Sequence, residues 1–215
     1  LRMSRGLGDV YKRQIMDRLI QQCILQVLEP ICEAKFFKRS NGFRPTHSAE
    51  NAIAQAERMI QNIGCYYVID IDIHGFFDNV NHGKLLKQMW ALGIRDKKLL
   101  SIISAMLKAE VAGIGFPEKG TPQGGIISPL LSNIVLNELD WWVASQWEEM
   151  PTKRNYVHRI YANGTPDKSN TIRALRIYTK LKECYLVRYA DDFKIFCKKH
   201  LDAVKLIDAT KQWLW

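Results

Sequence analysis

Apolar residues recur at helical spacing in the first part of the chain. Over residues 15–31 they lie three or four positions apart, which predicts a helix that Pro30 stops or kinks. A second helix is predicted over residues 49–62, because the Ser48 hydroxyl can cap its first turn. The apolar side chains of this helix that are expected to face a core are Ile53, Met59 and Ile60.

Strand patterns occur in the middle and near the end of the chain. Residues 65–73 are rich in β-branched and aromatic side chains and predict a strand, as do residues 111–116. Residues 184–190 and 193–197 predict a hairpin, whereas residues 151–170 are polar and predict a loop. Further helices are predicted over residues 83–92 and 96–108, from a Gly/Pro loop at 120–125 to about Trp147, and from Leu201 onward.

The composition is that of a globular protein. Of the 215 residues, 47% are hydrophobic and 25% are charged, and no apolar run approaches the roughly 18 residues of a membrane span. The five cysteines are scattered and form no CxxC pair. This pattern disfavours a zinc site or a disulfide framework and favours a reducing cytosol.

The net charge is +9, and much of it is concentrated in the last third of the chain. Residues 151–200 contain twelve Lys/Arg and four Asp/Glu. This excess is typical of a surface that binds phosphate backbones, and a solvated loop is the alternative interpretation. A membrane surface is disfavoured, because the basic residues do not fall on one amphipathic face.

Two adjacent acids, Asp191 and Asp192, lie between the apolar runs of the predicted hairpin. Their like charges repel, and a divalent cation is the usual means of stabilising such a pair; an ordinary hairpin turn is the alternative. A second acid-bearing strand contains Asp70 and Asp72, which alternation places on one face without distinguishing them. Two such strands side by side can hold two magnesium ions about 3.5–4 Å apart, the arrangement of two-metal phosphoryl transfer.

Two loops contain further candidate binding residues. In residues 120–125, the glycines let the backbone approach a ligand, Pro122 fixes the entry, and Gln123 offers a donor and an acceptor. Arg44 lies in a Gly-Phe-Arg-Pro loop, where its planar guanidinium could bind a phosphate. A plain helix-entry loop and a surface arginine are the alternatives.

Four blocks of sequence occur in an order that is specific to one family. They are Asn-Gly-Phe-Arg-Pro at 41–45, Asp-Ile-His-Gly-Phe-Phe-Asp-Asn at 72–79, Thr-Pro-Gln-Gly-Gly-Ile-Ile-Ser-Pro-Leu-Leu-Ser-Asn-Ile at 121–134, and Tyr-Ala-Asp-Asp-Phe at 189–193. With them, the chain from Asp17 onward resembles the reverse transcriptase domain encoded within bacterial group II introns.

The resemblance implies an α+β fold of the right-hand polymerase type, with fingers and palm and an antiparallel palm sheet packed on helices. The implied segments are fingers at 15–64 and 93–120 and palm at 65–92 and 121–215, with a basic insertion at 151–182. Residues 1–14 replace a basic block of the family and are expected to be a non-native junction. The thumb and the maturase regions are expected to be missing, because they would lie beyond Trp215.

The resemblance also implies the catalytic residues. Asp72 matches the metal-binding acid of the family, which lies five residues before a bulky aromatic ring, here Phe77. Asp72, Asp191 and Asp192 would hold two Mg²⁺ ions, for which Mn²⁺ can substitute, with the Ile73 carbonyl as an additional ligand.

Further roles in substrate binding are implied by the same resemblance. The Phe77 ring would exclude a 2′-hydroxyl and so select deoxynucleotides. The other residues implied to bind the deoxynucleotide are Arg44, Gln123, Gly124 and Asn133. Those implied to contact the primer and template are Tyr189, Pro122 and Gly125.

The implied function is that of an RNA-directed DNA polymerase of a mobile group II intron, linked to splicing and retrohoming. Its implied partners are an RNA template, a DNA primer, deoxynucleoside triphosphates and the intron RNA, in the bacterial cytoplasm, with no membrane and no organic cofactor. The alternatives are an RNA-binding splicing maturase without a significant polymerase role, or the reverse transcriptase of a retron or a diversity-generating element. An RNA-dependent RNA polymerase is disfavoured, because Phe77 should exclude ribonucleotides.

Overall fold

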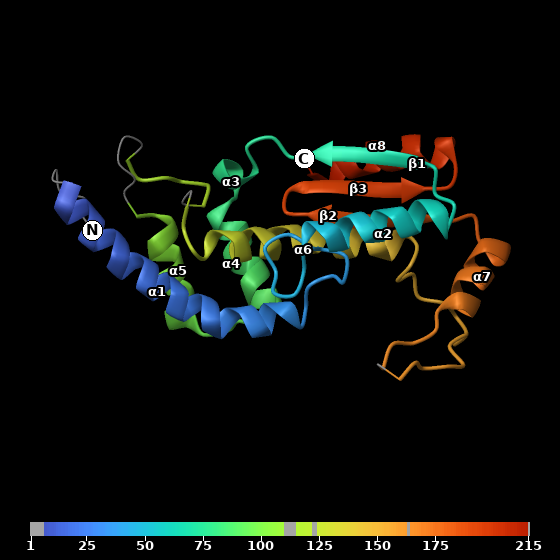
Figure 1. Cartoon of the computed structure of the whole chain (residues 1–215), viewed down its shortest axis with the longest axis horizontal. Helices are drawn as coiled ribbons and strands as arrows, with labels where there is room; N and C mark the ends of the chain where they lie inside the picture. The colour runs from blue at the N-terminus through green and yellow to red at the C-terminus, as the bar shows by residue number, and fades with distance from the viewer. Residues whose placement is uncertain (1–6, 110–114, 122–123, 163, 215) are drawn as a thin grey trace.

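The described strands form one three-stranded antiparallel sheet, which lies in the right-hand half of the view in Figure 1. The computed structural model describes residues 7–109, 115–121, 124–162 and 164–214. The strands are β1 (Tyr67–Asp72), β2 (Cys184–Tyr189) and β3 (Asp192–Cys197), in the spatial order β1-β3-β2. The predicted hairpin and the predicted antiparallel sheet are therefore confirmed, and β3 joins the hairpin to a strand from much earlier in the chain.

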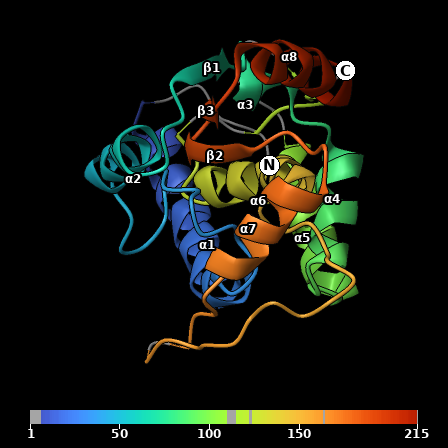
Figure 2. The same ribbon diagram turned by 90° about the vertical axis from the view of Figure 1, so that its right-hand side faces the viewer.

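Helices cover both faces of this sheet. They are α1 (Leu7–Glu33), α2 (Ala49–Gln61), α3 (Phe76–Asn79), α4 (His82–Ala91), α5 (Lys97–Leu107), α6 (Ser128–Gln146), α7 (Ser169–Tyr178) and α8 (His200–Leu214). Figure 2 shows α2 on one side of the strands, with α6 and α8 on the other side. The fold is thus α+β, as the sequence predicts.

The core of the protein is built around α6. This helix is rich in apolar residues and is buried on most of its surface, the polar side chains of Asn133, Asn137 and Asp140 included. It packs against β2, α4 and α1, and its leucines meet the inner face of the sheet, where Phe193 and Ile195 are fully buried. One continuous hydrophobic core therefore holds the described elements together, while the division into fingers and palm segments stays a prediction.

The first helix is longer than the sequence predicts. α1 runs from Leu7 to Glu33, so it passes through Pro30 and ends one turn later. A proline in a helix removes one N–H donor, but the Pro30 carbonyl still accepts from Ala34 N at 3.4 Å. The helical backbone also includes residues 7–14, where the sequence analysis predicts no element; that residues 1–14 form a non-native junction stays a prediction.

The second helix begins as predicted, but its buried face differs. The Ser48 hydroxyl accepts a hydrogen bond from Asn51 N, so the predicted cap is confirmed. Met59 is buried, whereas Ile53 is 66% exposed and Ile60 is 38% exposed. The prediction for these two isoleucines is wrong, because α2 packs on β2 and β3 with another part of its surface and leaves Ile53 at the rim of an open groove.

The remaining predictions for secondary structure had mixed outcomes. The helices predicted near α4, α5, α6 and α8 are confirmed, with Asn81 and Asp96 as side-chain caps of α4 and α5. Helix α7, which buries Ala174 and Leu175 on one face, was not predicted from the sequence. Most of the strand predicted at 111–116 lies outside the described residues.

Candidate active site

The three predicted catalytic acids lie at one end of the sheet. Asp72, the last residue of β1, is directly opposite Asp192, the first residue of β3. Asp191 precedes it in the two-residue turn that joins β2 to β3. The sequence predicts both adjacent acids between the strands, but Asp192 belongs to β3. Its side chain is therefore fixed on the same face of the sheet as that of Asp72.

The structure distinguishes Asp70 from Asp72. Lys194 Nζ lies 2.6 Å from Asp70 Oδ1 and 3.3 Å from Asp192 Oδ1. These two carboxylates raise the pKa of Lys194, the hydrogen bond to Asp70 having the largest effect. No residue in the described parts of the chain forms an ion pair with Asp72. Asp70 therefore has its own cationic partner, whereas the exposed Asp72 carboxylate is available to a ligand.

The donor chemistry at this end of the sheet fits a divalent metal ion. Carboxylate and carbonyl oxygens are the ligands that Mg²⁺ prefers, and directly opposed residues on antiparallel strands are about 4.5–5.5 Å apart at their Cα atoms. The Ile73 carbonyl accepts from Phe76 N at 3.2 Å and keeps one lone pair. Within the described residues, no group of three His, Cys, Asp or Glu side chains is already arranged to hold an ion.

Phe77 lies just beyond β1, in the short helix α3. Its half-buried ring meets the rings of Phe76 and Phe43 edge-on, with centroids 5.6 and 6.5 Å away. Phe77 O accepts a hydrogen bond from Thr121 N at 2.8 Å. The start of the glycine-rich loop is therefore attached to the residue that the sequence analysis assigns to sugar selection.

Contact between that loop and the chain beyond β1 requires a glycine. Gly120 has a φ of 93°, and a Cβ at this position would lie 3.0 Å from Asp78 O. Its carbonyl is within 2.7 Å of the buried His82 Nε2. These contacts fix the position of Gly120, from which the loop continues toward α6.

The rest of the loop is described only in part. Pro122 and Gln123 lie outside the described residues, so their assignments to the primer and the nucleotide stay predictions. Gly124 is exposed with a φ of 76°, which favours glycine, and the Gly125 carbonyl accepts from Ser128 N at the start of α6. The contacts predicted for these two glycines are likewise untested.

Arg44 does not extend toward solution. Its guanidinium donates to Glu33 at 2.8–3.0 Å and to the carbonyls of Phe37 and Ser40 at 2.8 and 2.6 Å. The side chain is 5% exposed. The arrangement therefore does not support the predicted contact with a triphosphate, because the donors of Arg44 already join α1 to the loop at 37–44.

The other two assigned residues differ in accessibility. Tyr189 is 41% exposed and lies directly opposite Asp192, next to the acids. Asn133 is fully buried, and its amide donates to Gly42 O and accepts from Arg188 Nη1. A nucleotide could contact Asn133 only if these hydrogen bonds broke.

A buried ion pair beneath the hairpin was not predicted from the sequence. Arg188 and Asp140 are both 0% exposed and form a bidentate pair at 2.7 and 2.8 Å. A signal was present in the sequence, because α6 is an apolar helix with polar residues at Asn133, Asn137 and Asp140, which share one face. Asn137 Oδ1 accepts from Phe37 N at 3.1 Å, so this face holds the segment that precedes α2.

The basic insertion at 151–182 lies away from the acids. Figure 1 shows α7 and the loop before it at the end of the sheet opposite the tip of β1. The insertion has eight Lys/Arg and one acid, and exposed aromatic rings such as Tyr178, which is 77% exposed. Lys168 pairs with Glu149, and Arg176 with Glu183; the other basic residues form no ion pair within the described residues.

These elements together define the fingers-and-palm fold of a right-handed polymerase. A structure of telomerase from Candida albicans, in complex with a fragment of telomeric RNA, superposes on 94% of this chain and 33% of its own, with a TM-score of 0.53 and 10% identity. At that identity the similarity shows the fold alone.

The family follows from sequence comparison. Residues 10–215 match the family described as reverse transcriptase (RNA-dependent DNA polymerase), so this chain belongs to the reverse transcriptase family. Protein YkfC of Escherichia coli K12 is 31% identical over 190 residues, covering 86% of this chain and 49% of that protein. The group II intron-encoded protein LtrA of Lactococcus lactis is 40% identical over 135 residues, covering 59% of this chain and 21% of LtrA.

The predicted resemblance to group II intron proteins is thereby confirmed. This chain spans half or less of the length of these two relatives. None of the helices in the described ranges combines the length and the apolar character that a membrane span requires.

Proposed function

We propose that this chain carries the polymerase site of an RNA-directed DNA polymerase of a mobile group II intron. It transfers deoxynucleoside monophosphates to a primer 3′-hydroxyl on an RNA template, as part of intron splicing and retrohoming. The observation that carries the proposal is the register of Asp72 against Asp192, with Asp191 in the adjoining turn, in a chain of the reverse transcriptase family.

The assigned residues have two roles, binding of the metal ions and selection of the nucleotide. Asp72, Asp191 and Asp192, with the Ile73 carbonyl, hold divalent ions, Mg²⁺ in the first place and Mn²⁺ as a substitute. Two such ions supply, when bound, activation of the primer 3′-hydroxyl and stabilisation of the leaving pyrophosphate. The Phe77 ring excludes a 2′-hydroxyl, and Tyr189, which lies opposite Asp192, contacts the primer.

The partners that we propose are the RNA template, the DNA primer, deoxynucleoside triphosphates and intron RNA, in the bacterial cytoplasm. The excess of basic side chains at 151–182 supports a contact with phosphate backbones. Exposed tyrosines among these cations suit unpaired bases, which stack on aromatic rings.

One observation favours a second role, that of a splicing maturase. The basic insertion and the acids lie at opposite ends of the sheet, so RNA on the insertion need not be the RNA that is copied. Binding of a structured intron RNA would use this surface without using Asp72, Asp191 or Asp192.

The first test is incorporation of deoxythymidine on a poly(rA) template primed with oligo(dT), in Mg²⁺, by the complete reading frame. An Asp191→Ala variant should lose incorporation, whereas Asp208→Ala, which changes an exposed acid on α8, should retain it. Absence of incorporation by the folded wild-type protein would contradict the polymerase proposal. A splicing assay with intron RNA would then test the maturase role.

A further inference from the structure

The turn that carries Asp191 is contacted by a fully buried guanidinium. Arg188 Nε and Nη2 donate to the two carboxylate oxygens of Asp140 at 2.8 and 2.7 Å. Arg188 Nη1 donates to Ala190 O at 2.7 Å and to Asn133 Oδ1 at 2.9 Å. The guanidinium therefore joins α6 to the backbone of the turn, one peptide unit before Asp191.

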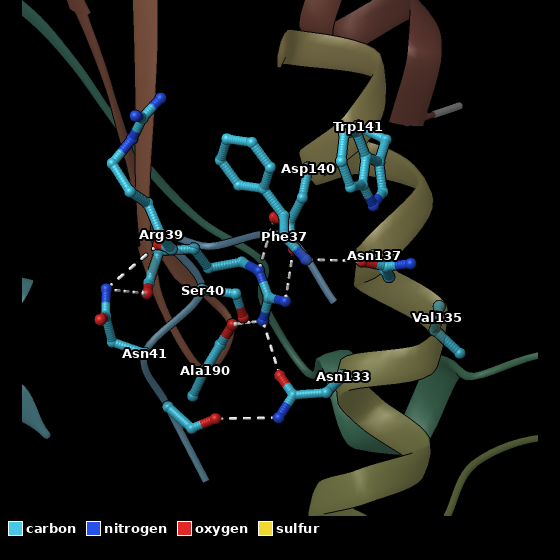
Figure 3. A network of polar contacts seen from close by, with 12 residues as sticks. Phe37, Arg39, Ser40, Asn41, Asn133, Val135, Asn137, Asp140, Trp141 and Ala190 are labelled. Carbon is cyan, nitrogen blue, oxygen red and sulfur yellow. Dashed lines mark hydrogen bonds and ion pairs between the residues drawn. The ribbon is translucent and has the colours of Figure 1, made fainter. Parts of the chain in front are cut away.

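A second contact reaches the same turn from the segment that precedes α2. A Cβ at Gly42 would lie 2.1 Å from Ala190 N and 2.8 Å from Ala190 Cα, so the two backbones touch. Asn133 Nδ2 donates to Gly42 O at 2.8 Å, and Asn41 N donates to Arg188 O at 2.8 Å. Figure 3 shows Asn133 and Asp140 pointing from α6 toward Ala190 and the segment that contains Ser40 and Asn41.

The backbone at Ala190 needs such support. Its φ is 56°, in the left-handed region that is unfavourable for a residue with a Cβ. Conformations of this kind persist only where the surroundings fix them, and they concentrate at functional sites. Here a hydrogen bond fixes the carbonyl of Ala190 and a glycine packs on its amide.

Stability alone is a weak reason for a buried ion pair. Removing two charges from water costs about as much as their attraction returns, and apolar replacements are often neutral or stabilising. The pair has a second consequence here, because the bidentate bond to Asp140 leaves Nη1 directed at the Ala190 carbonyl. The Asp140 carboxylate thus fixes the orientation of the Arg188 guanidinium, and the guanidinium fixes the backbone conformation of the turn at Ala190.

We propose that Arg188 is a positioning residue for the catalytic acids. Held by Asp140 and Asn133, it fixes the backbone at Ala190 and so the directions in which the Asp191 and Asp192 carboxylates face the metal ions. The inference rests on the proposed function, since it concerns the same acids. It assigns to Arg188, Asp140, Asn133 and Gly42 a role in geometry and none in contact with substrate.

Two variants test the proposal, each with a matched control. Arg188→Lys keeps the charge but loses the planar fork that bonds Asp140 and Ala190 together. Its control is Arg39→Lys, which alters another buried arginine beside β2, paired with Glu148. Gly42→Ala adds a Cβ that clashes with the backbone of the turn at Ala190. Its control is Gly83→Ala, where a Cβ would contact only Asn81 Oδ1 at 3.4 Å.

Four quantities are measured on the complete reading frame: kcat and KM for dTTP, the melting temperature, and the affinity for Mn²⁺ by electron paramagnetic resonance without turnover. Both test variants should lower kcat by roughly 100-fold, as expected for a misplacement near 1 Å, with the KM for dTTP little changed. Their Mn²⁺ dissociation constants should rise about tenfold, the usual effect of losing a group that orients metal ligands. The controls should keep wild-type kcat and Mn²⁺ affinity even where their melting temperature falls.

The outcomes separate this inference from the proposed function. Equal effects in the test and control variants, or a lower melting temperature alone, would overturn the positioning role. Failure of both test variants to fold, when Arg39→Lys folds, would show that the network is structural. An inactive wild-type protein would contradict the proposed function, and the Mn²⁺ affinities would still decide whether Arg188 positions the acids.

Discussion

Lys194 Nζ lies 2.6 Å from Asp70 Oδ1, so one of the two acids on the outer face of β1 already has a cationic partner. Asp72, two residues further along the same face, has no ion pair within the described residues. The alternation of side chains along β1 cannot show which of the two acids binds metal. The partner strand β3 distinguishes them, because it places a lysine opposite Asp70 and an acid opposite Asp72.

The first prediction concerns these two acids. Asp72→Asn should lower the rate of DNA synthesis by roughly 100-fold or more, because a metal ligand contributes several kcal/mol to the transition state. Asp70→Asn should change the rate by about fivefold at most, because an exposed ion pair is worth little. Single-nucleotide extension rates on one primer–template measure both. Equal losses in the two variants would mean that Asp70 also holds metal.

Phe77 should decide the choice of sugar. Phe77→Ala removes the ring implied to block a 2′-hydroxyl, so the ratio of kcat/KM for ribonucleotides to that for deoxynucleotides should rise about tenfold or more. Phe43→Ala is the control, since the Phe43 ring only touches Phe77 at its edge, 6.5 Å between centroids. An unchanged ratio in Phe77→Ala would show that another residue selects the sugar.

The basic insertion should contribute to affinity for RNA but not to the chemistry. Replacing Arg173 and Lys180 by glutamine should reduce the salt dependence of RNA binding by a slope of about 1 per lost phosphate contact. The measurement is RNA affinity at several salt concentrations, beside extension rates at saturating primer–template. A matched change of Lys97 and Lys98, basic residues at the start of α5, provides the control. A fall in the extension rate at saturation would argue that the insertion reaches the acids.

The buried thiols should make stability depend on alkaline pH. Burial raises the pKa of Cys32, Cys184 and Cys197 to about 12 and that of Cys65 to about 11, from an ordinary value of 9.0. These groups have a raised pKa in the folded state, so their contribution is complete below pH 9 and is lost as the pH rises from 9 toward 12. Urea unfolding at pH 8 and pH 10 should therefore give a lower free energy of unfolding at pH 10.

The same burial predicts a pattern of chemical labelling. At pH 8 in the folded protein, iodoacetamide should modify the exposed Cys23 much faster than the four buried thiols. Mass spectrometry of the folded and the urea-unfolded protein measures this difference. Rapid labelling of Cys184 or Cys197 in the folded protein would contradict the burial of β2 and β3 in the core.

Local features were predicted well from the sequence. The Ser48 cap, the β2–β3 hairpin and the helices near α4, α5, α6 and α8 depend on neighbours within a few residues, and these predictions are confirmed. The acids could be named because the family motif is local too. Features that depend on distant partners were missed: α2 covers only part of the sheet, so Ile53 is exposed, and Glu33 turns Arg44 inward.

The Arg188–Asp140 pair shows why such features escape a reading of the sequence. The two residues are separated by 48 positions, and the sequence around neither residue predicts that they form a contact. A charged residue in an apolar strand and another in an apolar helix each suggest an unfavourable burial. Only the fold shows that the two charges compensate each other.

The strand order β1-β3-β2 has a consequence for how the protein is made. The central strand of the sheet is the last of the three to be synthesised, and among the described strands β1 pairs with β3 alone. During translation, the backbone N–H and C=O groups of β1 therefore have no partner strand until residue 197 has left the ribosome. Long-range pairing of this kind slows folding and exposes strand edges to aggregation. The strand edges of β1 are therefore open to aggregation between the synthesis of β1 and that of the hairpin that bears Asp191.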